Sequence, residues 1–107
     1  MMDANQLLRE YADHGSEPAF RELVGRYIDL VYSVALRQVN GDAHLAEDIA
    51  QTVFTNLARQ SMEQRGPLAS GPCALGGWLH RHTGFVAADV RRTEQRRRAR
   101  EQMAAEM

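Results

Sequence analysis

Apolar residues recur every three or four positions along three stretches of this chain, and this spacing restricts the fold more than any other feature. Such a period places the apolar side chains on one face of an α-helix. The three stripes consist of Phe20, Leu23, Val24, Tyr27, Ile28, Val31, Val34 and Ala35, then Leu45, Ala46, Ile49, Ala50, Val53, Phe54 and Leu57, then Trp78, Leu79, His82, Phe85, Val86 and Val90. No stretch of useful length alternates as a half-buried strand would. We therefore predict an all-α protein, a bundle of three or four helices.

Capping residues indicate where the predicted helices begin. Asp3 followed by Gln6 has the spacing of a capping box and predicts a short first helix. Ser16 with Pro18 in the first turn predicts the start of a long second helix, because the missing N–H of proline costs little there. An Asn-Gly pair then breaks this helix, and Asp42 directly behind it is expected to cap the third.

Residues 60–77 show no helical period and contain Gly-Pro twice and Gly-Gly once. We predict a long Gly/Pro-rich loop before the last helix, and loops of this length within compact domains are usually functional or disordered. The single cysteine, Cys73, lies in this segment. It has no second cysteine with which to form an internal disulfide or a zinc site.

The C-terminal residues 95–107 are nearly all Arg, Gln, Glu, Ala and Met, a composition that favours helix but offers little to bury. A chain of 107 residues is long enough for a single core. We expect one helical domain over residues 1–94, followed over 95–107 by a protruding or frayed helical tail that begins a linker.

Positive charge is concentrated near the C-terminus, although the formal net charge is only −1. Between residues 80 and 100, seven Arg stand against two acids, Asp89 and Glu94. Every cation in the chain is Arg, whose planar fork suits phosphates and base stacking, although a GC-rich genome would produce the same bias. The segment is therefore interpreted either as a nucleic-acid surface or as a solvated helix face.

Motifs for catalysis and for cofactor binding are missing from the sequence. It contains no HExxH motif, no phosphate loop and no Ser/His/Asp arrangement, so we expect neither an enzyme nor a metal or cofactor site. His80 and His82 point in different directions on a helix, and His82 is expected to be a half-buried imidazole with a hydrogen-bond partner. No apolar run is long enough for a signal peptide or a bilayer span, so a cytoplasmic location without membrane contact is the default expectation.

Three blocks of sequence follow one another along the chain. Residues 19–37 are AFRELVGRYIDLVYSVALR, residues 41–54 are GDAHLAEDIAQTVF, and residues 78–92 are WLHRHTGFVAADVRR. The first is similar to the pattern AFxxLxxxYxxxVYxxALR, the second to GDxxxAEDLVQEVF and the third to WLYRIARNLALDYLRR. In this order they resemble region 2 of sigma-70-family factors of the extracytoplasmic-function (ECF) type, and the AED-x-x-Q-x-VF block is the most specific part.

The resemblance implies a helical module that binds the clamp helices of the β′ subunit in core RNA polymerase. It also implies recognition of the promoter minus-10 element and capture of non-template-strand bases as the duplex melts. Thr52 departs from a usual Glu, which weakens one expected polymerase contact, and Gly84 and Phe85 replace a common Arg-Asn pair, which leaves base preference open. The family's region 4 is not within these residues, so either the chain is a domain cut out of a longer protein, which we expect, or the protein works without region 4.

Candidate polymerase contacts on the third predicted helix are Glu47, Asp48, Gln51 and Phe54. Spacings of three and four place the polar side chains together beside the apolar stripe, where they would meet a basic coiled coil. The alternative is that Glu47 and Asp48 merely stabilise the positive end of the helix dipole. That alternative leaves Gln51 unexplained.

Candidate DNA contacts on the last predicted helix are Arg81, Phe85, Ala88, Arg91, Arg92 and Arg96. The arginines are predicted to contact phosphates, which makes binding salt-dependent. The loop over 60–77 has the position of the family's base-capturing loop, and a disordered connector is the alternative. Trp78 and Phe85 fit either the core or a surface on which bases stack.

A second class of function is compatible with the same residues. ECF sigma factors are commonly held inactive by an anti-sigma factor that covers both the polymerase and the DNA face. The chain is then an interaction module whose main partner is an anti-sigma factor. Binding of the isolated domain to single-stranded minus-10 DNA or to β′ clamp helices distinguishes the two.

Overall fold

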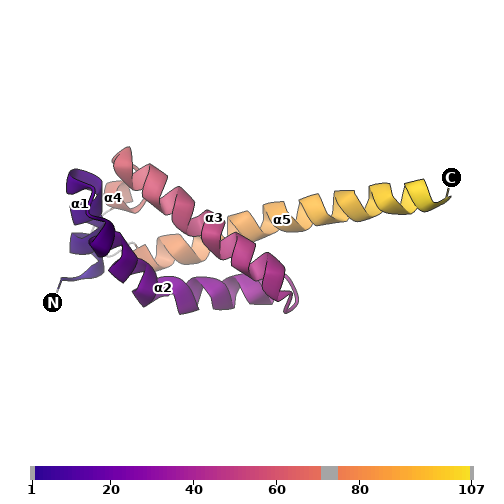
Figure 1. Cartoon of the computed structure of the whole chain (residues 1–107), viewed down its shortest axis with the longest axis horizontal. Helices are drawn as coiled ribbons and strands as arrows, with labels where there is room; N and C mark the ends of the chain where they lie inside the picture. The colour runs from indigo at the N-terminus through magenta and orange to yellow at the C-terminus, as the bar shows by residue number, and fades with distance from the viewer. Residues whose placement is uncertain (1, 71–74, 107) are drawn as a thin grey trace.

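The computed structural model describes residues 2–70 and 75–106, and within them the chain is all-α, as predicted. No strand occurs in these residues. The helices are α1 (Ala4–His14), α2 (Glu17–Gln38), α3 (Ala43–Met62), α4 (Pro67–Ser70) and α5 (Leu75–Glu106). Figure 1 shows α3 crossing α5, and α5 continuing beyond the bundle to the C-terminus.

The predicted capping box begins α1. The Asp3 carboxylate accepts a hydrogen bond from the Gln6 backbone N–H at 2.8 Å, and the Gln6 side chain accepts one from the Asp3 backbone N–H at 2.8 Å. These two bonds satisfy donors that a helix N-terminus leaves unpaired. Gly15 ends α1 in the left-handed region with φ 67°, a conformation that glycine adopts without strain.

Side-chain caps also begin the two long antiparallel helices. Ser16 Oγ accepts from the Ala19 N–H at 3.3 Å, and an Asp42 carboxylate oxygen accepts from the Leu45 N–H at 3.1 Å. Between α2 and α3 the chain reverses through Asn40 and Gly41, both with positive φ. Because this connection is so short, α3 folds back along α2 and the two apolar stripes face each other.

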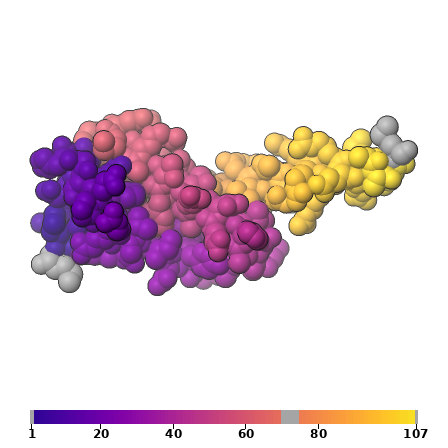
Figure 2. Space-filling view, in the orientation of Figure 1, coloured from indigo at the N-terminus to yellow at the C-terminus, as the bar shows by residue number. Residues whose placement is uncertain are grey.

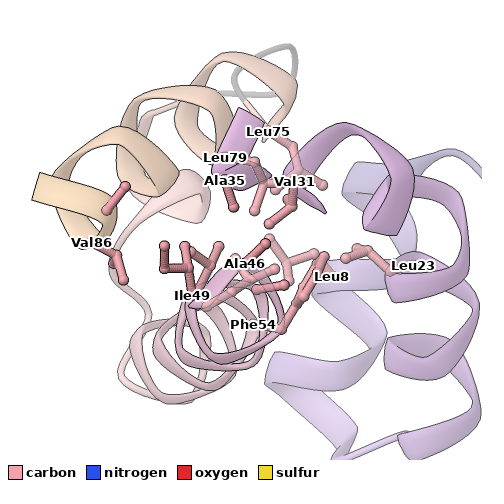
Figure 3. Packing of buried hydrophobic residues seen from close by; sticks show 14 of the residues in the cluster. Leu8, Leu23, Val31, Ala35, Ala46, Ile49, Phe54, Leu75, Leu79 and Val86 are labelled. Atoms are coloured by element: carbon pink, nitrogen blue, oxygen red, sulfur yellow. The ribbon is translucent and has the colours of Figure 1, made fainter. Parts of the chain in front are cut away.

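The core lies where α2, α3 and α5 meet, and α1 closes one end against α2 and α3. Figure 3 shows side chains from the three long helices converging on this centre, including Val31, Ile49 and Leu79. All three are fully buried. The predicted stripes of α2 and α3 therefore supply most of the core, and α5 adds Leu75, Leu79, Val86 and Ala87.

The long helix α5 gives the molecule its shape. It has 32 residues, and the molecule measures 59 × 24 × 22 Å. Its radius of gyration is 16.3 Å, whereas a compact domain of this length has a radius of about 13 Å. Residues 95–106, where a helical tail was predicted, are helical and exposed and project from the bundle (Figure 2). Among the described residues, no helix combines the length and the apolar character that crossing a membrane requires.

The long loop predicted over residues 60–77 is in part wrong. Helix α3 extends to Met62, α4 occupies Pro67–Ser70, and α5 already begins at Leu75. Leu68 of α4 is buried against the core, which explains why this Gly/Pro-rich segment is folded there. Residues 71–74, and with them Cys73, lie outside the described residues.

Two residues of the predicted apolar stripes are not in the core. Phe85 is 69% exposed, so of the two placements left open for it, core or surface, the structure shows the surface. It lies about 100° around α5 from Val86, which takes the core position instead. Ile28 is 37% exposed on the flank of α2, where neither α3 nor α5 covers it fully.

Ser61 near the end of α3 offers a test of the core. Its side chain is fully buried, and its hydroxyl has no hydrogen-bond partner among the described residues. An unsatisfied buried hydroxyl costs about 1–3 kcal/mol. We therefore expect Ser61→Ala to raise the free energy of unfolding, measured by denaturant titration, by about 1 kcal/mol.

Thr83 is the matched control for this substitution. It is equally buried, but its hydroxyl donates to the Leu79 carbonyl at 2.6 Å. Thr83→Val is therefore expected to lower stability by about 1 kcal/mol. Equal destabilisation by the two substitutions would contradict the assignment of Ser61 as unsatisfied.

Candidate functional site

An apolar groove runs along the surface between α2 and α3. It has a volume of about 660 Å³ and is lined by Phe20, Val24, Ile28, Tyr32, Glu47, Ala50, Gln51, Phe54, Thr55 and Ala58. The α2 wall consists of four residues spaced by four, which form one ridge of that helix. Each wall spans about three helical turns, or roughly 17 Å. The α2–α3 groove is therefore long enough and apolar enough to bind one helix of a partner.

Three of the four predicted polymerase contacts line the α2–α3 groove: Glu47, Gln51 and Phe54. Asp48 is exposed but is not part of the lining, because it lies about 100° around the helix from Glu47. Asp48 remains adjacent to Gln51, three residues further along the helix, so its predicted polymerase contact stays a prediction outside the groove lining.

The helix dipole does not explain the position of these acids. Helix α3 begins at Ala43, and its first turn contains no acidic residue. The dipole's effect falls off within that first turn. Glu47 is thus too far along the helix for the dipole to be the main reason for its presence, which leaves its place on the groove wall.

A second hollow continues the α2–α3 groove towards α1. It has a volume of about 330 Å³ and shares Phe20 and Val24 with the groove. The rings of Tyr11 and Phe20 are 4.6 Å apart at its edge. The α2 wall was not predicted as a binding surface, because its stripe was assigned to the core. The stripe itself gave no signal for the groove, because α1, α3 and α5 all pack on α2.

Five of the six predicted DNA contacts share one face of α5. Their spacings of four, three, four and four form the α5 stripe, which consists of Arg81, Phe85, Ala88, Arg92 and Arg96. All are exposed except Ala88, which is half-buried. The sixth, Arg91, lies about 100° around from Arg92 and lines a separate polar hollow with Arg98, Asp42 and Glu94. The predicted arginine contacts therefore lie on two faces of α5, and only the face of the α5 stripe carries an aromatic residue, Phe85.

Ion pairs occupy some of these arginines and leave others unpaired. Arg92 pairs with Asp89, and Arg97 bridges Glu94 at 2.9 Å and Glu101 at 2.8 Å. Hydrogen bonding from Arg97 lowers the pKa of Glu94, which keeps that carboxylate charged. Within the part of the chain that the structure describes, Arg81 and Arg96 have no carboxylate partner. The two are available to an external anion.

A small pocket opens beside the start of the α5 stripe. It has a volume of about 160 Å³ and is lined by Trp78, Arg81, His82 and Phe85. The rings of Trp78 and His82 stack, with centroids 4.4 Å apart and planes 13° from parallel. This aromatic pocket was missed in the sequence, although its spacing of three, four and seven residues indicates one helix face.

Side chains of α3 form hydrogen bonds to the histidine of the aromatic pocket and to each other. Asn56 Nδ2 lies 3.0 Å from His82 Nε2, and Arg59 donates to Asn56 Oδ1 at 3.1 Å. The prediction that His82 is a half-buried imidazole with a partner is confirmed. Burial, and secondly the charge of Arg59, lower the pKa of His82 below its ordinary value.

The start of the segment before α5 is tied to α1. Gln64 accepts from Arg9 at 3.1 Å and donates to Asp13 at 3.1 Å. These bonds fix the chain just before α4, at the end of the molecule where α5 begins (Figure 1). The predicted base-capturing role of residues 60–77 remains a prediction, since 71–74 lie outside the described residues.

The chemistry of these surfaces is that of binding. They offer apolar contact in the α2–α3 groove, cations along the α5 stripe and stacked rings in the aromatic pocket. In residues 2–70 and 75–106, no group of three or more His, Cys, Asp or Glu is placed to hold a metal ion. Comparison with protein-family models, with curated proteins and with solved structures finds no match.

Proposed function

We propose that this chain is a transcription-initiation module of the kind found in region 2 of ECF sigma factors. In this proposal the α2–α3 groove binds the β′ clamp helices of core RNA polymerase. The α5 stripe and the aromatic pocket hold the non-template strand of the promoter minus-10 element. The observation that carries the proposal is that two exposed surfaces of different chemistry lie on different helices of one scaffold.

The groove side of the proposal follows from its lining. A long apolar trough between two helices accepts the apolar face of a partner helix. Glu47 and Gln51 at its rim provide an acceptor for cations and an amide for hydrogen bonds. A basic helix of a coiled coil satisfies both requirements, and the clamp helices are the partner that the family resemblance suggests.

The strand side of the proposal follows from energetics. Removing a base from a duplex costs a few kcal/mol, and stacking it on an aromatic ring returns about 1–3 kcal/mol. Trp78 and Phe85 offer rings, and Phe85 is too exposed to serve the core. Arginine contacts to phosphates supply the remaining free energy, so no nucleotide hydrolysis is needed.

The proposal is tested by comparing Ile28→Arg with Leu30→Arg. Ile28 is 37% exposed and lines the α2–α3 groove, whereas Leu30 is 38% exposed on the same helix and does not line it. An arginine at position 28 fills the groove and repels a basic partner. We expect at least tenfold weaker binding to core RNA polymerase, about 1.4 kcal/mol or more. Binding is measured with the fluorescently labelled protein.

Leu30→Arg is the matched control, because it adds the same side chain at the same exposure. It should leave polymerase binding unchanged, and circular dichroism should show both variants equally helical. Equal binding by the two variants would exclude the α2–α3 groove as the polymerase contact. No binding by wild type would exclude the polymerase as partner.

A further inference from the structure

The hydrogen bonds around His82 fix which atoms carry protons. Arg59 has only donors, so the Asn56 atom that faces it at 3.1 Å is the carbonyl oxygen Oδ1. The amide nitrogen of Asn56 therefore faces His82, at 3.0 Å from Nε2. An amide nitrogen only donates, so Nε2 must accept. His82 is thus neutral in this arrangement, with its proton on Nδ1.

Protonation of His82 is incompatible with this chain of hydrogen bonds. An imidazolium donates from both nitrogens, so Nε2–H and the Asn56 amide would present two donors to each other. Rotating the Asn56 amide by 180° gives His82 an acceptor but places the amide nitrogen against Arg59. No orientation of Asn56 serves both neighbours once His82 carries a proton.

On protonation, the weaker of the two hydrogen bonds made by Asn56 is the one that breaks. A hydrogen bond from an imidazolium to a carbonyl oxygen is charge-assisted and about twice as strong as a neutral one. Arg59 is exposed, and water readily replaces its contact with Asn56. The Asn56 amide therefore turns towards His82, and Arg59 is released. The Trp78 stack persists, because a cation over an indole face is attracted to it.

We propose that the Arg59–Asn56–His82 chain is a proton-operated switch beneath the aromatic pocket. When His82 is neutral, Arg59 is hydrogen-bonded to Asn56. When His82 is protonated, Arg59 is released and a positive charge lies against Trp78. Charged groups near His82 are Arg59 from α3 and Arg81 from α5, both cations. On α2, the titratable residue that lies against the start of α5 is Tyr27, beside Gly76. No carboxylate among the described residues pairs with His82.

The direction of the switch follows from these neighbours. Burial and Arg59 both oppose the imidazolium, so the pKa of His82 lies below its ordinary value. The neutral form therefore prevails at neutral pH, and the protonated form develops only at a lower pH than for an ordinary imidazole. An anionic strand in the aromatic pocket stabilises the protonated form of His82. Strand binding and protonation of His82 therefore strengthen each other.

The switch is measured in the free protein by the fluorescence of Trp78, the only tryptophan in the sequence. An imidazolium stacked on an indole quenches its emission, because it accepts an electron from the excited ring more readily than neutral imidazole does. We expect a one-proton loss of emission on lowering the pH from about 7.5 to about 5. His82→Gln keeps an acceptor for Asn56 and should abolish this loss. His80→Gln, at an exposed neighbouring histidine, should leave it intact.

Asn56→Asp separates the switch from a simple stacking effect. A carboxylate accepts from Arg59 and from protonated His82 at once, so the conflict between donors disappears. The midpoint of the fluorescence change should rise by about 1–3 pH units, as expected beside an opposite charge. An unchanged midpoint in Asn56→Asp, or a persistent pH response in His82→Gln, would overturn the switch.

The effect on strand binding rests on the proposed function and is tested separately. One added phosphate contact at 0.1 M salt strengthens single-strand binding about fivefold. Wild type should therefore bind a thymine oligonucleotide, whose bases take up no proton here, about fivefold more tightly at the pH where the fluorescence change is complete than at neutral pH. His82→Gln should show no such gain. An equal gain in His82→Gln would refute the link to binding, whereas no binding at either pH would reject the proposed function and leave the fluorescence result standing.

Discussion

Leu79→Ala is expected to lower the free energy of unfolding by about 2–5 kcal/mol, because it removes a fully buried side chain and leaves a cavity. Leu79 lies on α5 where this helix meets α2 and α3 (Figure 3). A domain of this size has only about 5–15 kcal/mol in total. The loss is measured by denaturant titration followed by circular dichroism, and we expect a transition midpoint well below that of wild type.

Met103→Ala is the control for this cavity. Met103 lies on the same helix but is 66% exposed on the protruding part. Its truncation is expected to change stability by no more than about 0.5 kcal/mol. If Met103→Ala cost as much as Leu79→Ala, residues 95–106 would have to be packed rather than projecting. If Leu79→Ala cost less than about 1 kcal/mol, the described core would be wrong.

Helix starts were the most predictable part of this fold, because caps are local. Asp3, Ser16 and Asp42 each bond to a backbone N–H three residues ahead, so the chemistry is contained in a few neighbouring letters. The core was nearly as predictable, since residues spaced by three and four share a face whatever packs against it. Both rules depend only on distance along one helix.

The binding surfaces were harder to predict, because they depend on how many neighbours a helix has. Three helices, α1, α3 and α5, pack on α2, but they do not fully cover its Ile28 flank. A stripe records apolar character and not what covers it, so the α2–α3 groove was hidden among predicted core residues. Phe85 was left open between core and surface for the same reason.

The support beneath the aromatic pocket could not be predicted at all. Asn56 and His82 are 26 residues apart, on helices whose relative rotation no local pattern specifies. Neither residue is unusual in its own helix. Only packing of α3 on α5 brings the amide to the imidazole, and only then does the donor conflict with Arg59 exist.

The largest expected effect on binding comes from neutralising the α5 stripe with Arg81→Gln, Arg92→Gln and Arg96→Gln together. The three side chains are exposed on one face, and each phosphate contact contributes about 0.7 to the salt dependence of single-strand binding. The slope of log affinity against log salt should fall by about 2, and affinity at 0.1 M salt by about a hundredfold. Fluorescence anisotropy with a minus-10-type oligonucleotide at several salt concentrations measures both.

A charge-matched variant decides whether position or net charge matters. Arg21→Gln, Arg37→Gln and Arg65→Gln together remove the same charge from exposed positions outside α5. If strand binding is a general attraction to a cationic protein, both triple variants lose affinity alike. If the α5 stripe holds the phosphates, the second variant keeps the wild-type slope, because phosphate contacts act only where cations touch the strand. A loss of slope shared equally by the two variants would therefore remove the α5 stripe from the proposal, even if wild type bound single strands tightly.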